Sequence, residues 1–236
     1  MGRMNYTGWK RFGFESLSIF IAVVSAFALN NWNENRKSHN SENKILLEIK
    51  NGLEKDIVDI QLNLEGHENG IYSADYFRNI LANRKVNPDS VHIYFFYLTR
   101  DFVSVQNTAG YETLKSKGLE LISNDSLRLQ IISLYEYDYN TLRKLEEEYY
   151  EMQFQENYFK EFNEHLAPYF EFDSLQRISG ILLPIKLPED RRKILSLYLW
   201  KIKQNRTWII SIYLDIEKSI KKIQQQINNE ISAYNH

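Results

Sequence analysis

The chain has 236 residues, with 29 Lys and Arg against 31 Asp and Glu, nine glycines, four prolines and no cysteine. The near balance of charge gives no overall positive field that would attract nucleic acid, and the lack of cysteine excludes disulfides, thiolate catalysis and Cys-ligated metal sites. Few glycines and prolines beside many Leu, Ile, Glu and Lys residues favour long helices over a β-sandwich or a barrel.

The first element is an apolar stretch from Phe12 to Leu29 that contains one charge, Glu15. As a helix it would span about 27 Å, close to the roughly 30 Å of a bilayer core. Trp9 and Trp32 flank it as membrane-interface aromatic residues do. The pattern predicts a transmembrane anchor, with residues 1–37 as cytoplasmic stub and anchor and residues 38–236 as an outer helical domain.

Charge around the anchor predicts its orientation. Residues 1–37 carry five basic and two acidic side chains, so they hold +3 and the rest of the chain holds −5 of the total of −2. Lys10 and Arg11 precede the apolar stretch, and the positive-inside rule then places the N-terminus in the cytoplasm and the outer domain in the bacterial periplasm. A signal peptide cleaved at the A-x-A sequence of residues 26–28, or a buried helix of a soluble protein, are the alternatives.

One face of the anchor carries small and polar side chains. At about 100° per residue, Glu15, Ala22 and Ala26 fall close to one line, with Ser18 beside them. Small residues four apart let helices approach closely in lipid, so this face predicts a homo-oligomer interface or a contact with another membrane protein. Glu15 would then face a partner or line a pore; alternatively it only reaches back to the interface and pairs with Arg11.

The outer domain is expected to be helical nearly throughout. An apolar stripe from Ile45 to Leu64 predicts a helix over 41–64, and Gly66 and Gly70 predict a kink before a helix over 71–83. Pro88 is expected to open a short aromatic helix. The sequence Ser-Asn-Asp at 123–125 is expected to cap a long acidic helix over 125–166, and Pro188 to precede a final helix ending near Tyr234.

The final helix has the most regular pattern in the chain. Its isoleucines are spaced 3-4-4-3-4-4, a period of about 3.67 that is typical of a nearly straight coiled-coil stripe. The stripe either packs inside its own bundle or joins two subunits; it comprises Ile209, Ile212, Ile216, Ile220, Ile223, Ile227 and Ile231. Residues 136–164 carry a net charge of −6 and are expected to lie against Arg191, Arg192, Lys201, Lys203 and Arg206 of this helix.

No group of residues demands catalysis, so no catalytic residue, cofactor or metal site is predicted. The five histidines are scattered without metal-ligand spacing, and the sequence has no phosphate-binding glycine loop or nucleophile elbow. Glu161 and His165, four residues apart, are read as a surface ion pair rather than metal ligands. The tyrosines and phenylalanines are read as core, with a tyrosine-lined ligand cleft as the alternative.

Three local patterns resemble a family of small bacterial membrane-anchored proteins known only as a domain of unknown function. They are the Gly-Phe-Glu sequence at 13–15, the Asn-Asn-Trp-Asn-Glu sequence at 30–34 with the basic residues that follow, and the segment over 108–125. The family usually has Glu directly after Gly, so Phe14 is a departure. The resemblance implies membrane attachment and a helical outer domain, and it implies no activity.

The sequence as a whole predicts an all-α, single-pass protein of the cell envelope with an elongated bundle of long helices. The expected function is that of a non-enzymatic, homo-oligomeric scaffold or interaction protein. A channel whose pathway is lined by Glu15, and a ligand-binding sensor domain, remain the alternatives.

Overall fold

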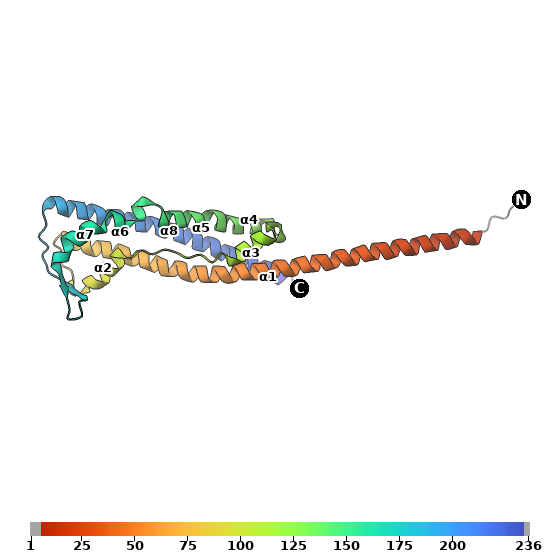
Figure 1. Ribbon diagram of the computed structural model, residues 1–236, viewed down its shortest axis with the longest axis horizontal. Coiled ribbons are helices and arrows are strands. Elements are labelled where there is room, and N and C mark those ends of the chain that lie inside the picture. The colour runs from red at the N-terminus through yellow and green to blue at the C-terminus, as the bar shows by residue number, and fades with distance from the viewer. Residues whose placement is uncertain (1–5, 234–236) are drawn as a thin grey trace.

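A computed structural model describes the backbone of residues 6–233 and the side chains of residues 15–233. Two long helices dominate it: α1, Tyr6–Leu81, has 76 residues, and α8, Glu189–Ala233, has 45. The N-terminal part of α1 projects alone from the bundle, whereas its C-terminal part packs along α8 for most of the length of the outer domain (Figure 1). The shape is a helical bundle on a single helical stalk.

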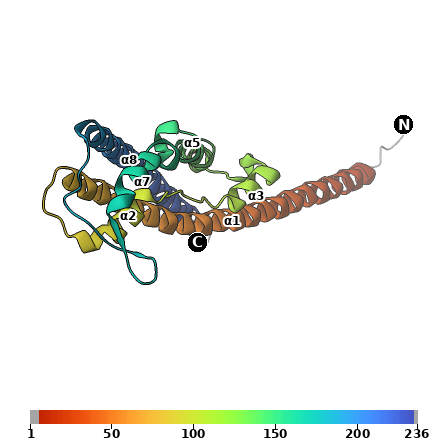
Figure 2. The ribbon, with the colours of Figure 1, turned by 60° about the vertical axis from the view of Figure 1, so that its left-hand side comes forward.

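Shorter elements cover the α1–α8 pair (Figure 2). In chain order they are η1 Pro88–Ser90, α2 Val91–Thr99, α3 Ala109–Lys117, η2 Leu119–Leu121, α4 Asp125–Ser133, the π-helical turn η3 Leu134–Asp138, α5 Tyr139–Glu147, η4 Tyr150–Met152, α6 Phe154–Asn157, α7 Phe159–Leu166, η5 Ala167–Tyr169, β1 Phe170–Phe172 and β2 Ile178–Ile181. Helix α2 begins after Pro88 as predicted, because proline suits the first turn of a helix, where its missing N–H is not needed.

The predicted kink at Gly66 and Gly70 is wrong, because α1 continues through both glycines. Each glycine makes room for a side chain instead. A Cβ at Gly66 would lie 2.2 Å from the Phe102 ring, and a Cβ at Gly70 would lie 2.6 Å from the Arg206 guanidinium. These glycines therefore permit close packing on an intact helix, and the cost of about 1 kcal/mol for glycine in a helix is offset by that packing.

The isoleucine stripe of α8 packs inside its own domain. Ile209, Ile216, Ile220, Ile223 and Ile227 are buried in the core, and Ile212 and Ile231 are partly buried against it. The core-facing side chains of α1 include Ile45, Ile49, Leu53 and Ile60. The stripe thus holds the bundle together within one chain.

The predicted continuous helix over 125–166 is wrong beyond Glu147. Asn124 caps α4 as expected, since its side chain accepts a hydrogen bond from the Leu127 N–H. The chain continues through the π turn and α5, then leaves the helix at Glu148 and resumes as the short helices α6 and α7. The break lets Met152 and Phe154 enter the core and places Glu151 against α8.

One hairpin departs from an all-helical outer domain. Strands β1 and β2 pair antiparallel, with Phe170 opposite Ile181 and Glu171 opposite Gly180. The hairpin lies at the end of the bundle farthest from the stalk, in the interval between the helix predicted over 125–166 and the final helix predicted after Pro188 (Figure 1). The fold is otherwise all-α over the described residues.

Candidate functional site

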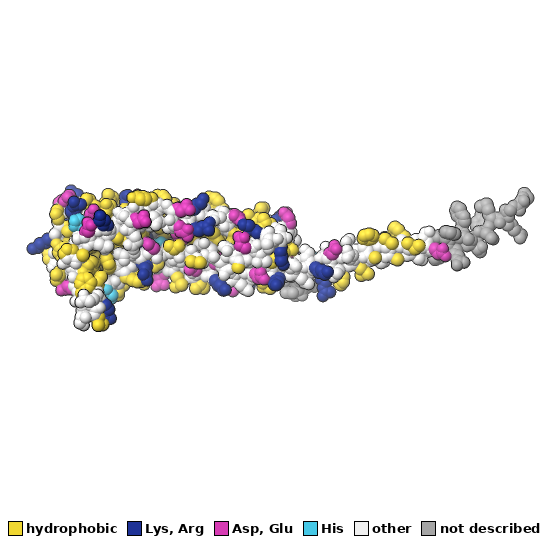
Figure 3. Space-filling model, viewed as in Figure 1, with side chains coloured by type: hydrophobic (Ala, Val, Ile, Leu, Met, Phe, Trp, Pro, Cys, Tyr) yellow, Lys and Arg dark blue, Asp and Glu magenta, His cyan; other side chains and the backbone are white. Residues whose placement is uncertain are grey.

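The stalk is the first candidate site. Side chains of residues 15–40 are all exposed, including Glu15, Ser18, Ala22 and Ala26 on the predicted interface face and Trp32 at its end. Hydrophobic side chains cover much of this stalk (Figure 3). Among the described residues it is the one helix long and apolar enough to cross a membrane, with none of its apolar window buried. The side chains of Trp9, Lys10 and Arg11 lie outside the described residues.

The second candidate is a polar cluster inside the bundle, built around the non-helical segment 100–108 that runs along α1. Asp59 of α1 accepts hydrogen bonds from the Val105 N–H at 3.0 Å and the Ser104 hydroxyl at 2.7 Å. One turn earlier, Asp56 accepts from the Asn107 N–H at 2.7 Å and the Tyr139 hydroxyl at 2.6 Å. These carboxylates supply hydrogen-bond acceptors to backbone N–H groups of a segment that has no helix or sheet partners.

Glu146 of α5 extends the cluster toward α8. Its carboxyl group accepts from the Tyr213 hydroxyl and, in longer contacts of 3.3 and 3.4 Å, from the Ser104 N–H. The side chain is only 7% exposed. Burial raises the pKa of Glu146 to about 7. The hydrogen bonds from Tyr213 and Ser104 favour the ionised form and act in the opposite direction, but they are outweighed. Glu146 therefore titrates near neutral pH inside the domain.

Arg206 of α8 is fully buried in the same region. Its Nη2 donates to the carbonyl oxygens of Leu98 at 3.2 Å and Arg100 at 3.0 Å, with a longer contact to that of Tyr97 at 3.4 Å. These carbonyls belong to the C-terminal end of α2, where a helix leaves acceptors unpaired and where its dipole favours a cation. The rings of Phe102 and Phe154 flank the guanidinium. Burial lowers the pKa of Arg206 to about 10, so it stays protonated at neutral pH.

His67 of α1 lies beside this guanidinium, with 3.2 Å between its Nδ1 and Nη1 of Arg206. Burial, and then the charge of Arg206, lower the pKa of His67 to about 3, so the ring is neutral and Nδ1 accepts. The buried Nε2 has no hydrogen-bond partner of normal geometry. The nearby backbone of Phe102 raises the pKa of His67 and so opposes this shift, but it forms no hydrogen bond of normal geometry with Nε2.

A cavity of about 260 Å³ adjoins the cluster; its lining includes His67, Arg206, Glu146, Asp101 and Phe154. Neutral His67 and protonated Arg206 form its buried wall. The Ser104 hydroxyl donates to Asp59, and the Tyr213 hydroxyl donates to Glu146. The arrangement fixes segment 100–108 against α1 and α5.

The sequence contains a local signal for this cluster. Asp56, Asp59, Asn63 and His67 are spaced 3-4-4, so they share one helix face, and they interleave with the apolar stripe of α1. Polar residues at core-facing positions of an amphipathic helix indicate buried hydrogen-bonding sites. What the pattern cannot give is the partner, because segment 100–108 and Arg206 are remote in sequence.

The expected match between the acidic region and α8 holds in part. Lys201 pairs with Glu151 at 3.0 Å and Arg191 with Glu161 at 3.6 Å. Lys203 instead pairs with Asp75 of α1 at 2.6 Å, and Arg192 and Arg206 bind backbone carbonyls. At these three positions the partners belong to α1 or to the end of α2 instead, although Glu146 and Glu147 line the same cavity as Arg206.

The metal expectation concerns Glu161 and His165. Their side chains lie 3.3 Å apart as an ion pair of one helix face. Over the described part of the chain no three His, Asp or Glu side chains are grouped closely enough to hold a metal ion.

No family model, no curated protein and no solved structure matches this chain. The resemblance of its N-terminal and middle segments to membrane-anchored bacterial proteins therefore stays a prediction.

Proposed function

We propose that this protein is a non-enzymatic interaction or scaffold protein of the bacterial inner membrane. It is anchored by the stalk of α1, assembles as a homo-oligomer and holds its outer domain in the periplasm. The observation that carries the proposal is the stalk itself. It leaves large apolar side chains without any cover from the chain, and these include Leu17, Ile19, Phe20, Ile21, Val23, Val24, Phe27 and Leu29.

An exposed apolar surface of this extent needs lipid or protein around it. Fully burying one such side chain is favourable by about 1.5–3 kcal/mol relative to leaving it in water. Exposing even one apolar turn of this helix to water is therefore unfavourable. The helix is also long enough for a bilayer core, and the basic residues before it favour a cytoplasmic N-terminus. These facts support an anchor and its orientation.

The face of Glu15, Ser18, Ala22 and Ala26 supports self-association. Small side chains allow two backbones to pack closely, while Phe20, Val24 and Phe27 of the same helix face elsewhere. A carboxylate on that face is less costly against a partner helix than against lipid tails. A ring of such helices around Glu15 is the channel alternative.

Cysteine crosslinking tests the assembly, because the chain has no native cysteine. In full-length protein in membranes, Ala22→Cys should form disulfide-linked dimers on mild oxidation. Val24→Cys, about half a turn away, is the matched control and should stay monomeric. Equal crosslinking of both variants, or of neither, would contradict the proposed face.

Two further measurements separate orientation and pore formation. A periplasm-active reporter fused after His236 should be active, and activity of a cytoplasmic reporter there would reverse the orientation. Glu15→Gln should leave the oligomer intact, and reconstituted protein should conduct no ions. A conductance that Glu15→Gln abolishes would establish the channel in place of the scaffold.

A further inference from the structure

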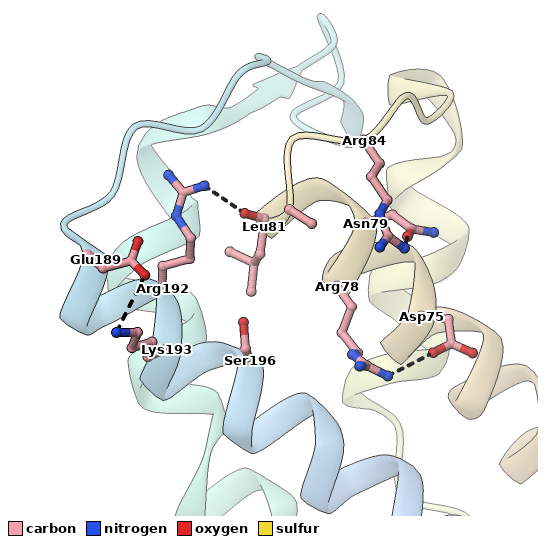
Figure 4. Close-up of a pocket in the computed structure, with 10 residues that line it drawn as sticks. Asp75, Arg78, Asn79, Leu81, Arg84, Glu189, Arg192, Lys193 and Ser196 are labelled. Atoms are coloured by element: carbon pink, nitrogen blue, oxygen red, sulfur yellow. Dashed lines mark hydrogen bonds and ion pairs between the residues drawn. The ribbon is translucent and has the colours of Figure 1, made fainter.

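The end of the bundle farthest from the stalk contains a second cavity, of about 650 Å³, within the size range of small-molecule sites. Its wall is formed by the C-terminal end of α1, the turn that follows it and the first turns of α8. Figure 4 shows Arg192 and Ser196 of α8 on one side of the opening and Arg78, Asn79 and Arg84 on the other. We refer to it as the distal cleft.

The distal cleft is cationic. Four basic side chains line it, Arg78, Arg84, Arg192 and Lys193, against the two acidic side chains Asp75 and Glu189. Asp75 lies 2.6 Å from Lys203, outside the lining, but 3.5 Å from Arg78. Lys203, which lies outside the cleft, is the nearer cation and therefore neutralises much of the charge of Asp75. The excess positive charge of the cleft remains at its opening.

Two of the guanidiniums have only neutral partners among the described residues. Nη1 of Arg192 donates to the Leu81 carbonyl at 2.8 Å, and Nη1 of Arg84 donates to the Asn79 side-chain oxygen at 3.3 Å. The Nε of Arg192 is buried without any hydrogen-bond partner. The bond to Leu81 fixes the Arg192 guanidinium while leaving donors unused, a preorganised arrangement that lowers the cost of binding an anion.

We propose that the distal cleft binds a phosphate-bearing anion between Arg84 and Arg192. Guanidinium groups present paired N–H donors that match phosphate oxygens, and the N-terminal turns of the long helix α8 add a favourable dipole. Leu81 and Ala82 give the cleft an apolar wall for an uncharged part of the ligand. The phosphate belongs to a soluble molecule or to a lipid headgroup.

Distance excludes headgroups of the anchoring bilayer as the source. Helix α1 is unbroken from Trp32 to Leu81, and at about 1.5 Å per residue these residues lie about 74 Å apart. A lipid ligand would therefore have to come from a second, facing membrane. The cleft needs neither the oligomer nor a pore, so its test is independent of the proposed function.

The experiment uses full-length protein in nanodiscs of zwitterionic lipid and titrates inorganic pyrophosphate by calorimetry. Saturable binding at one site per chain is expected, weakening as salt is raised because salt screens the charges. Arg84→Gln should weaken binding about tenfold, the loss expected for a charge-assisted hydrogen bond of about 1.4 kcal/mol. Arg84 is exposed and bonds no backbone group, so this variant keeps the fold; Arg192→Gln should act in the same direction.

Lys222→Gln, an exposed lysine near the other end of α8, is the matched control and should bind as the unaltered protein does. A second arm adds vesicles of phosphatidylglycerol or of phosphatidylcholine. Pyrophosphate binding that depends on Arg84 establishes a soluble source, and Arg84-dependent capture of phosphatidylglycerol vesicles alone establishes a headgroup. Binding in neither arm, or equal loss in the Lys222→Gln control, would overturn the proposal.

Discussion

The two halves of α1 form one continuous helix but meet opposite surroundings. Over residues 15–40 every side chain is exposed and many are large and apolar, whereas over residues 41–81 one face of the helix, which carries acidic as well as apolar side chains, is buried against the bundle. The stalk turns apolar groups outward because lipid is the environment that we propose for it. The outer half turns Asp56 and Asp59 inward because segment 100–108 needs hydrogen-bond acceptors. Hydrophobicity alone therefore does not determine which side chains of α1 face the core.

If this contrast is correct, substitutions inside the polar cluster should change the stability of the outer domain, and substitutions on the stalk should not. The free energy of unfolding of the outer domain, measured by denaturant titration of the full-length protein in detergent, is a common scale for both halves.

The largest effect is expected for Arg206→Met. Methionine fills much of the same volume but leaves carbonyls at the end of α2 buried without a donor, each costing about 1–3 kcal/mol. We expect a loss of about 3–5 kcal/mol, as for other buried charged groups removed from their partners. Lys203→Met, one turn away, removes the partly exposed pair with Asp75 and should cost about 1 kcal/mol or less. Equal losses for both variants would mean that the buried guanidinium has no special role.

A smaller, pH-dependent effect is expected for Glu146→Gln. The pKa of Glu146 is raised from 4.5 to about 7 by burial, so the folded state binds more protons than the unfolded state between these values. Stability from this carboxyl is present below pH 4.5 and is lost as the pH rises toward 7.

Glutamine cannot titrate, so relative to the unaltered protein the variant should gain up to about 3 kcal/mol between pH 4.5 and 7.5. His67, whose lowered pKa costs stability as the pH falls below 6.5, contributes equally to both proteins and cancels. A difference in free energy that stays constant with pH would show that Glu146 is ionised throughout.

The smallest effect on unfolding is expected for Ala22→Leu on the stalk. The outer domain should change by less than about 0.5 kcal/mol, as for surface positions in general. The mass of the detergent-solubilised complex should fall, because leucine blocks close approach of the helices. Ala28→Leu adds the same volume on another side of the helix and should leave the mass unchanged. An unchanged mass in both variants would reduce the stalk to an anchor without an interface.

The sequence predicts those parts of the fold that depend on local periodicity and capping. The apolar stripes of α1 and α8, the cap at Asn124 and the start of α2 after Pro88 are all present. The kink predicted at Gly66 and Gly70 is wrong because a glycine in a helix can mark either a break or a close approach of another side chain. Here the positions of Phe102 and Arg206 show a close approach. The break after Glu147 escaped prediction because the residues there are good helix formers, and tertiary contacts of Met152 and Phe154 outweigh that preference.

The polar cluster depends on residues far apart in the chain. Asp59 and Ser104 are separated by 45 residues and His67 and Arg206 by 139, so no local pattern pairs them. The burial of Arg206 does have a local signal, because it stands between Ile202 and Ile209 on the apolar face of α8, but the sequence does not give its partners. A cation is needed at this position because the packing of α2 brings its C-terminal carbonyl groups to Arg206.

Because α1 is one continuous helix, it also fixes the rotational orientation of the outer domain about the axis of the stalk. At about 3.6 residues per turn, 36 residues complete ten turns, so a side chain 36 positions further along points in the same direction. The anchor positions Glu15, Ser18, Ala22 and Ala26 are thereby in phase with Asn51, Glu54, Val58 and Leu62, all of which are exposed on the side of α1 away from the core. Copies that meet along the stalk would bring this outer ridge of α1 toward their common axis, and leave α8 and the covering helices on the outside of the assembly.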